Sequence, residues 1–198
     1  MKKFLTLLVM ATVMTLFAKE SVAQVADPDD SWKNDTCDMR ALRDAIGDGL
    51  LFNGEPQYWI NDFSYYREIY NEKCEGWCDA LYYYMHSFPM KSGGFKVYTT
   101  YKFEPGWPED EAEEGFSQLL AYIYKDDEAV EVEPEPELNA FEFNDHNVFA
   151  NIWSVLFLDD AIVFFYNKEN ETDATRGVVF TWDGETMTKT YEGVIDDR

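Results

Sequence analysis

Two pairs of neighbouring side chains have the types needed for acid–base chemistry. Asp145 is followed by His146, and Asp159 is followed by Asp160. An acid with an imidazole, or two carboxylates, could give and take a proton. Adjacent side chains in an extended chain point to opposite sides, and Asp159-Asp160 separates two apolar runs by the length of a hairpin turn. The sequence therefore predicts a polar loop at the first pair and a turn at the second, and Asp145 and His146 remain the catalytic residues of an alternative hypothesis.

Neither pair is accompanied by a nucleophile or by a set of metal ligands. No Ser or Cys stands in a catalytic motif. His86 and His146 are the two histidines of the chain, and neither has a metal ligand at a suitable spacing. We therefore predict no metal and no cofactor, and we expect binding rather than catalysis.

Aromatic side chains are the best candidates for contacts to a ligand. They make up 17% of the chain, and tyrosine offers a large apolar body with a hydroxyl group at its tip. We predict that Tyr98, Trp153, Phe165 and Tyr166 bind a small apolar molecule. The alternative is that the same side chains fill the core.

Three apolar runs near the C-terminal end must position these residues. Ile152–Leu158, Ala161–Tyr166 and Gly177–Trp182 are rich in Val, Ile and Phe, which favour strands. Both faces of the first two runs are apolar, so the sheet is expected to be covered on both sides.

The rest of the chain alternates strand-like runs with turns. A short helix is predicted at 36–46, capped by Asp35 or Thr36, and an exposed acidic loop at 131–137, which Pro134 and Pro136 break. Further strands are predicted at 58–66, 78–87, 94–103, 116–124, 138–143 and 186–191. No helical crossover separates them, which favours an all-β, mainly antiparallel fold. We predict an up-and-down β-barrel with a short N-terminal helix, and a β-sandwich is the alternative.

The first 23 residues are typical of a secretory signal peptide. Lys2-Lys3 precede an apolar run, and Ser21-Val22-Ala23 forms a small-residue cleavage site. An N-terminal membrane anchor is the alternative. We predict residues 1–23 as signal peptide, 24–50 as leader and short helix, and 51–198 as the barrel domain of a secreted, periplasmic or lumenal protein.

The charge of the chain excludes two classes of partner. The formal net charge is −23, and removal of the signal peptide, with three basic residues and one acidic residue, takes it to −25. Such a surface repels nucleic acids and anionic membranes. The mature chain also has no second apolar span, so no membrane insertion is expected.

Cysteines and sequons fit an oxidising compartment. Cys37, Cys74 and Cys78 allow one disulfide, from Cys37 to Cys78 or to its neighbour Cys74. Asn34 and Asn170 begin glycosylation sequons that only a eukaryotic secretory route would use.

Several stretches resemble the lipocalin family. Leu51-Phe52-Asn53-Gly54, followed by Trp59, is similar to the start of the first lipocalin strand, although the spacing from Gly to Trp is stretched. The strand that opens at Cys78, and the run from Trp153 through Gly177–Thr181, resemble the lipocalin domain of violaxanthin de-epoxidase and its relatives. The resemblance covers about residues 51–184 and implies a barrel that binds an elongated apolar molecule, such as a carotenoid or another isoprenoid.

The resemblance would also imply acid-assisted opening of an epoxide with ascorbate as reductant. The family's two acidic positions fall on Asn151 and Trp77, and its histidine falls within 81–84. An amide and an indole cannot donate the proton that the opening alkoxide needs. We therefore expect a ligand-binding relative, with a xanthophyll de-epoxidase-like enzyme and an extracellular protein-interaction module as the two alternatives.

Overall fold

The computed structural model describes seven stretches of the chain: residues 28–47, 56–70, 78–104, 115–116, 119–139, 152–166 and 174–197. The chain divides into two units, Met1–Ser31 and Trp32–Arg198. Of the first unit, residues 28–31 are described, and they begin the 3-10 helix η2 (Pro28–Asn34). All described strands belong to the second unit, and their pairings are antiparallel.

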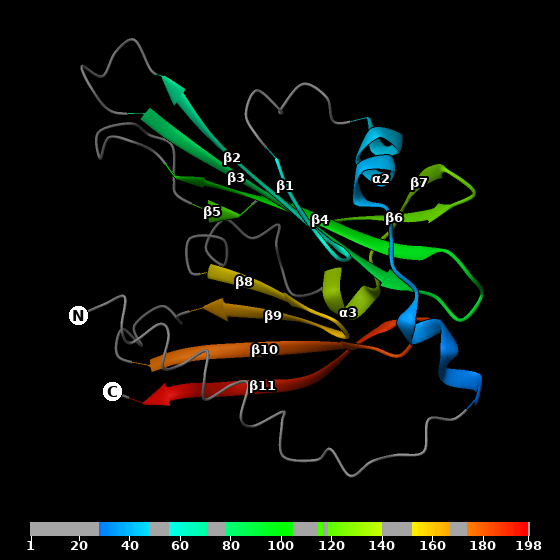
Figure 1. Ribbon diagram of the computed structural model, residues 1–198. Coiled ribbons are helices and arrows are strands. Elements are labelled where there is room, and N and C mark those ends of the chain that lie inside the picture. The colour runs from blue at the N-terminus through cyan, green and yellow to red at the C-terminus, as the bar shows by residue number, and fades with distance from the viewer. Residues whose placement is uncertain are drawn as a thin grey trace. The chain divides into compact units, whose positions relative to one another are not determined.

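Sheet A is a meander in which most neighbours in sequence are neighbours in space (Figure 1). Its strands are β1 (Gln57–Trp59), β2 (Asp62–Tyr70), β3 (Cys78–Pro89), β4 (Phe95–Glu104), β5 (Gly115–Phe116), β6 (Leu120–Lys125) and β7 (Glu128–Val132). The order is β1-β2-β3-β4-β6-β7, and β5 pairs with the far end of β4. Gly93 and Gly94, both with positive φ, turn the chain from β3 to β4.

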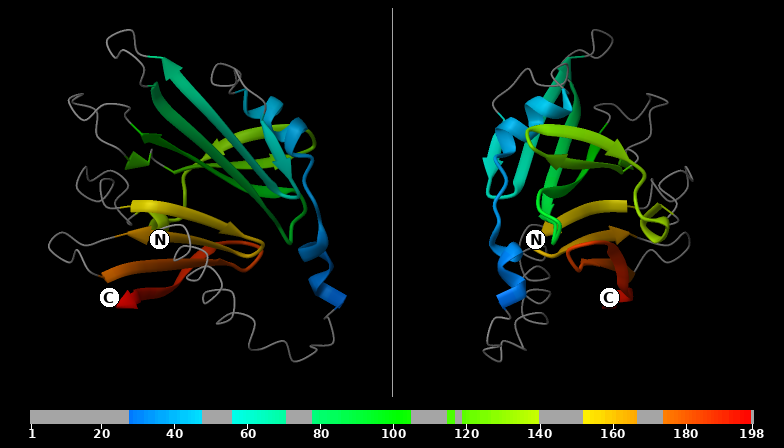
Figure 2. Two further views of the ribbon diagram at one scale, coloured as in Figure 1. Left: turned by 60° about the vertical axis from the view of Figure 1, so that its left-hand side comes forward. Right: turned by 90° about the vertical axis from the view of Figure 1, so that its right-hand side faces the viewer.

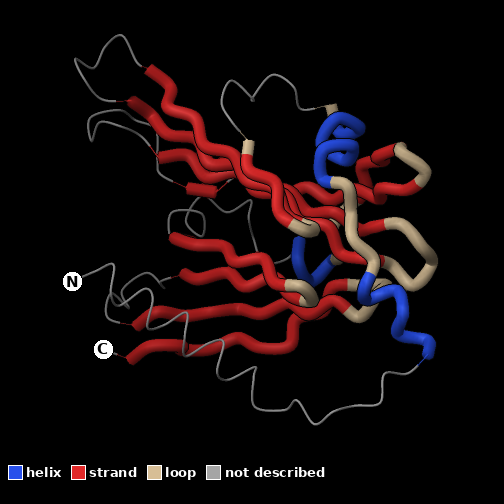
Figure 3. Tube along the Cα trace, viewed as in Figure 1, coloured by secondary structure: helices blue, strands red, loops and turns tan. Residues whose placement is uncertain are grey.

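Sheet B holds the three apolar runs and the last strand. Its order is β11-β10-β9-β8, with β8 (Ile152–Leu158), β9 (Ala161–Tyr166), β10 (Ala174–Trp182) and β11 (Met187–Asp197). Leu158 pairs with Ala161, so Asp159-Asp160 forms the predicted two-residue turn. The tube in Figure 3 shows this second set of strands, in red.

The predicted all-β, antiparallel class is confirmed, but the barrel is not closed. No backbone pairing joins sheet A to sheet B among the described strands, although β5 lies against β8. Figure 2 shows the two sheets from two further sides. Among the described residues, the side chains between the sheets form one shared core.

Core 1 lies between the two sheets. Its largest completely buried members are Tyr98 and Phe88 from sheet A and Phe164 and Phe180 from sheet B. Trp182 of β10 packs against Phe88 and donates an Nε1–H···O hydrogen bond of 2.7 Å to the Pro89 carbonyl. This bond satisfies the one polar atom that the buried indole brings into the core.

Core 2 lies between helix α2 (Met39–Ile46) and the other face of sheet A. Met39 and Leu42 point from the helix into this core, because three-residue spacing puts them on one face. The residue that caps the N-terminus of α2 is Asp38, and not Asp35 or Thr36 as predicted. Its carboxylate accepts hydrogen bonds from the backbone N–H groups of residues 40 and 41, which have no partner inside the helix.

Core 3 lies on the face of sheet B that points away from core 1. Val163 and Phe165 of β9 and Val179 of β10 are buried there, while the alternate residues of β9 belong to core 1. Both faces of β9 are therefore buried, as the apolar pattern of its sequence predicts.

The acidic, proline-broken run differs from the predicted exposed loop. Strand β7 ends at Val132, and Glu135 then enters the protein with only 13% of its side chain exposed. Pro136 begins a short helix, α3 (Pro136–Asn139), where the sequence predicts a strand from Leu138 onward. Proline suits the first turn of a helix, and Leu138 anchors this turn in core 1. The acid between the two prolines is therefore turned into the protein.

Trp32 packs closely against Gly184, which lies in the turn between β10 and β11. A substitution of this glycine tests that contact. The φ of Gly184 is +95°, and an added Cβ would lie 2.6 Å from Trp32 Cη2, whereas Gly93 (φ +79°) has no atom within 4 Å of that position. Both substitutions to alanine incur a backbone cost of about 1 kcal/mol. Gly184→Ala adds a steric cost of about 1–3 kcal/mol. We expect urea unfolding to show the larger loss in Gly184→Ala, and equal losses would contradict the packing of Trp32.

Candidate ligand-binding site

The predicted ligand contacts do not form one site. Tyr98 and Tyr166 lie in core 1, whereas Phe165 lies in core 3 on the opposite face of sheet B. Trp153 belongs to β8, at the point where the register with β9 shifts. Its side chain is not among those that the structure describes. Three of the four residues are therefore placed, and they fill two separate cores.

Tyr98 is held by a buried ionic cluster. Its hydroxyl donates a 2.5 Å hydrogen bond to Glu135 Oε2, and Lys96 Nζ lies 3.6 Å from Glu135 Oε1. Burial, and then the adjacent Glu135 carboxylate, raise the pKa of the Tyr98 phenol well above its usual range. The phenol therefore stays protonated and donates its hydrogen bond to the Glu135 carboxylate. This arrangement makes Tyr98 a structural residue rather than a ligand contact.

The predicted disulfide at Cys37 is wrong. The Cys37 thiol is free and buried, and burial first of all raises its pKa to about 11, so it stays protonated. Its backbone N–H binds Asn61 Oδ1, and the Asn61 carbonyl accepts from Ser87 of β3. Cys78 begins the same strand nine residues before Ser87, which is about 30 Å of extended chain. A disulfide needs Cα atoms within about 7 Å, so this register forbids the bridge.

The remaining predicted positions are placed only in part. Asn34 is exposed at the last residue of η2. Asp145, His146 and Asn170 lie outside the described residues, as do Cys74 and the two positions that carry the acids in the resembled family, 77 and 151.

Sequence reasoning missed a row of side chains that crosses sheet A. Trp59 of β1 pairs with Asp62 of β2, Asp62 with His86 of β3, and His86 with Tyr98 of β4. Directly paired residues of antiparallel strands share one face, so the row runs from the sheet edge into core 1. Exposure falls along it, from 62% at Trp59 to 4% at His86 and none at Tyr98.

Within the described part of the chain, the buried His86 imidazole has no hydrogen-bond partner on either ring nitrogen. Its ring stacks on Phe157 of sheet B at 5.4 Å, and its Nδ1 lies 4.0 Å from Asp62 Oδ1, too far for a hydrogen bond. Burial lowers the pKa of His86 to about 4 and raises that of Asp62. At neutral pH the imidazole is therefore uncharged, and it packs as an aromatic ring between the sheets.

A groove lies on the same face of sheet A, at the neighbouring row of paired residues, Gln57, Ser64 and Tyr84. We call it the tyrosine groove; its volume is about 480 Å³, and it is lined by Gln57, Ser64, Tyr65, Tyr66, Tyr82 and Tyr84. Gln57 pairs with Ser64 and Ser64 with Tyr84, which places these three side chains on the face that bears His86. Tyr84 also packs against core 1, whereas the side chain of Tyr65 belongs to core 2.

The tyrosines at the outer end of the groove form a pair. The rings of Tyr66 and Tyr82 lie 4.9 Å apart at 43° to one another, and Tyr66 is 46% exposed. The Tyr66 hydroxyl donates a 3.0 Å hydrogen bond to Glu68 Oε1, and Lys102 is the register partner of Tyr82 on β4. The described part of the lining thus combines aromatic rings, hydroxyl groups and an amide, with Glu68 and Lys102 beside it.

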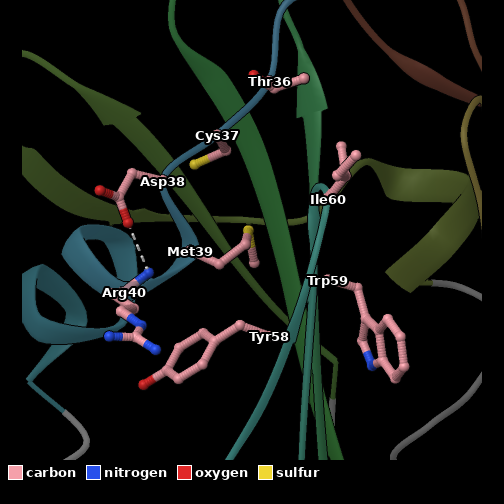
Figure 4. A pocket seen from close by; sticks show the side chains of 8 residues that line it. All are labelled: Thr36, Cys37, Asp38, Met39, Arg40, Tyr58, Trp59 and Ile60. Atoms are coloured by element: carbon pink, nitrogen blue, oxygen red, sulfur yellow. Dashed lines mark hydrogen bonds between the residues drawn. The ribbon is translucent and has the colours of Figure 1, made fainter.

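A second hollow, of about 500 Å³, lies between the start of α2 and β1 (Figure 4). The Arg40 guanidinium lies 4.9 Å from the Tyr58 ring centroid, and Asp38 is engaged as the helix cap. Trp59 points to the other side of β1 from Tyr58. Both charged groups of this hollow are engaged, Asp38 as the helix cap and Arg40 over the Tyr58 ring, so we do not take it as the ligand site.

The groove residues could not be found by spacing alone. Tyr82, Tyr84 and His86 alternate along one strand, a pattern that signals one face. Which partners stand opposite depends on the register with β2, and that register is fixed by packing on α2 and sheet B.

No family model, curated protein or solved structure matches this chain. Within the described residues, no helix is both long and apolar enough to cross a membrane. The same part of the chain contains no cluster of three His, Cys, Asp or Glu side chains that could hold a metal ion. The chemistry of the groove must therefore be interpreted from its own residues.

Proposed function

We propose that the protein binds a small molecule in the tyrosine groove, outside the cytoplasm. The observation that carries this proposal is the lining: tyrosines gathered with Ser64 and Gln57 around a hollow of about 480 Å³. Sites for small molecules combine aromatic surface with a few polar groups that fix orientation. The signal-like first 23 residues support the location, and the lipocalin resemblance supports a carrier role, with an apolar ligand such as an isoprenoid as one class to test.

Binding is expected to be saturable and to depend on the groove. The test titrates carotenoids, retinoids, fatty acids and methyl glycosides into the purified chain, with native mass spectrometry and aromatic fluorescence as readouts. Tyr82→Ala is expected to weaken binding about two- to tenfold, because stacking contributes about 0.5–1.5 kcal/mol. Tyr101, 42% exposed on the opposite face of sheet A, supplies the control Tyr101→Ala. Absence of saturable binding across the whole panel would contradict the proposal.

A protein-interaction module is the second candidate. Trp59 and Ile60 are 62% and 77% exposed at the tip of the hairpin between β1 and β2. Large exposed apolar side chains side by side are enriched where proteins bind one another. This function would be favoured if the panel gave no ligand.

A further inference from the structure

Strand β7 ends sheet A with one side open. Among the described strands it pairs with β6 alone (Figure 1). The other sheet edges are shorter or partly covered: β1 has three residues, β5 lies against β8, and the Lys189 N–H of β11 already bonds Glu137 Oε2. Within the described part of the chain, β7 is therefore the edge that best suits pairing with another chain.

The hairpin turn determines which backbone groups of β7 face outward. Asp126 and Asp127 both have positive φ, 53° and 63°, the geometry of a two-residue turn of type I′. Glu128 directly follows this turn, so it forms a hydrogen-bonded pair with its register partner on β6. Such pairs alternate with non-hydrogen-bonded pairs, so the N–H and C=O groups of Ala129 and Glu131 point away from β6. Each of these residues offers a donor and an acceptor to an added strand.

The side chains of β7 combine an apolar position with two acids. Val130 is 59% exposed, and its register partner on β6, Ile123, is 37% exposed. Glu128 and Glu131 are exposed, and the ion pairs of the described residues involve neither of them. Lys125, the residue opposite Glu128, donates its side-chain hydrogen bond to a backbone carbonyl instead. The edge therefore presents unneutralised carboxylates next to an apolar pair.

We propose that β7 binds an extended, basic segment of another protein, which adds a strand to sheet A. In this mode of recognition, backbone hydrogen bonds give affinity and the side chains opposite the edge give specificity. An antiparallel partner places an apolar side chain beside Val130 and basic side chains beside Glu128 and Glu131, because opposite charges on paired strands attract. The net charge of −23 favours the approach of such a segment. The edge is separate from the tyrosine groove, so the two proposals can fail independently.

The probe is a synthetic peptide with valine opposite Val130, lysine opposite Glu128 and Glu131, and threonine elsewhere. It is titrated into the purified chain at low salt by isothermal titration calorimetry. One control peptide has glutamate in place of both lysines, and the other carries N-methyl groups on the residues that would bond Ala129 and Glu131. We expect saturable binding of the probe, binding at least about fourfold weaker for the glutamate peptide, and none for the N-methylated peptide.

Two variants of Glu131 separate the backbone from the charge. Glu131→Pro removes the outward N–H and leaves the bonds to β6 in place, since proline is tolerated on edge strands, so binding should be lost. Glu131→Gln keeps the N–H and is expected to weaken binding at most about fivefold. The control Glu185→Gln removes an exposed acid from the turn between β10 and β11 and should leave binding unchanged.

Hydrogen exchange gives a readout that depends on no variant. The Ala129 and Glu131 amides should exchange quickly in the free protein and become protected when the probe saturates it, whereas Val130, whose N–H faces β6, is protected in both states. No binding of the probe, equal binding of either control peptide, or unchanged exchange at the two outward amides would overturn the proposal. Concentration-dependent dimers that protect these amides would overturn it as well, because the edge would then pair with a second copy.

Discussion

Replacing Glu135 with alanine is expected to lower the free energy of unfolding by about 3–5 kcal/mol, the usual effect of removing one partner of a buried charge pair. Glu135 accepts from the Tyr98 hydroxyl and faces Lys96, whose side chain is 11% exposed. Without the carboxylate, a phenol and an ammonium group lose their partner inside the protein. Urea unfolding followed by tryptophan fluorescence measures the effect.

Two further variants serve as comparisons for the stability loss of Glu135→Ala. Glu133→Ala removes an exposed acid two residues earlier and is expected to change stability by less than about 0.5 kcal/mol. Glu135→Gln keeps an acceptor for Tyr98 but removes the charge opposite Lys96, so its loss should lie between the other two. Similar losses for Glu135→Ala and Glu133→Ala would show that Glu135 is not held inside in solution.

Acidification is expected to destabilise the wild type through His86. The histidine titrates near 6.5 when unfolded and near 4 when folded, so the unfolded chain takes up the proton first. The stability contributed by the neutral imidazole is complete above pH 6.5 and is lost as the pH falls to about 4. A shift of this size corresponds to about 3 kcal/mol. Burial raises the pKa of Asp62, so the folded chain takes up this proton before the unfolded chain does. Protonation of Asp62 therefore offsets part of the loss at the acidic end of this pH range.

The measurement compares unfolding at pH 7 and pH 4 in the wild type and in His86→Phe. The variant retains an aromatic ring beside Phe157 and Phe88, and it cannot titrate. Its loss of stability on acidification should be smaller than that of the wild type by up to about 3 kcal/mol. His146→Gln, at the only other histidine, is the control. Parallel pH profiles for the wild type and His86→Phe would show that His86 is accessible to water in solution.

Local patterns predicted sheet B well. The Val, Ile and Phe runs at 152–158 and 161–166 match β8 and β9 at both ends, since the strands are limited by a polar turn between them. The strands predicted at 78–87 and 94–103 correspond to β3 and β4, and glycines turn the chain between them. These features depend on residues within about a dozen positions of each other, which a sequence shows directly.

Features that depend on distant residues were not predictable. Closure of a barrel depends on how two sheets approach, and no pattern within a strand encodes it. The Cys37–Cys78 pairing failed because it needs the position of Cys37 along β3, which Asn61 and Ser87 determine. Glu135 was assigned to an exposed loop because its sequence neighbours are acids and prolines, while its partners, Tyr98 and Lys96, lie almost forty positions away.

An open sheet has an edge where another chain could add a strand, and β7 ends sheet A in this way. Val130 of that strand is exposed, but Glu128 and Glu131 belong to the same five residues, and Asp126 and Asp127 form the preceding turn. Two copies meeting edge to edge would bring these carboxylates together, and like charges on paired strands repel. The acidic composition thus protects the protein against aggregation at an edge that ring closure would have removed.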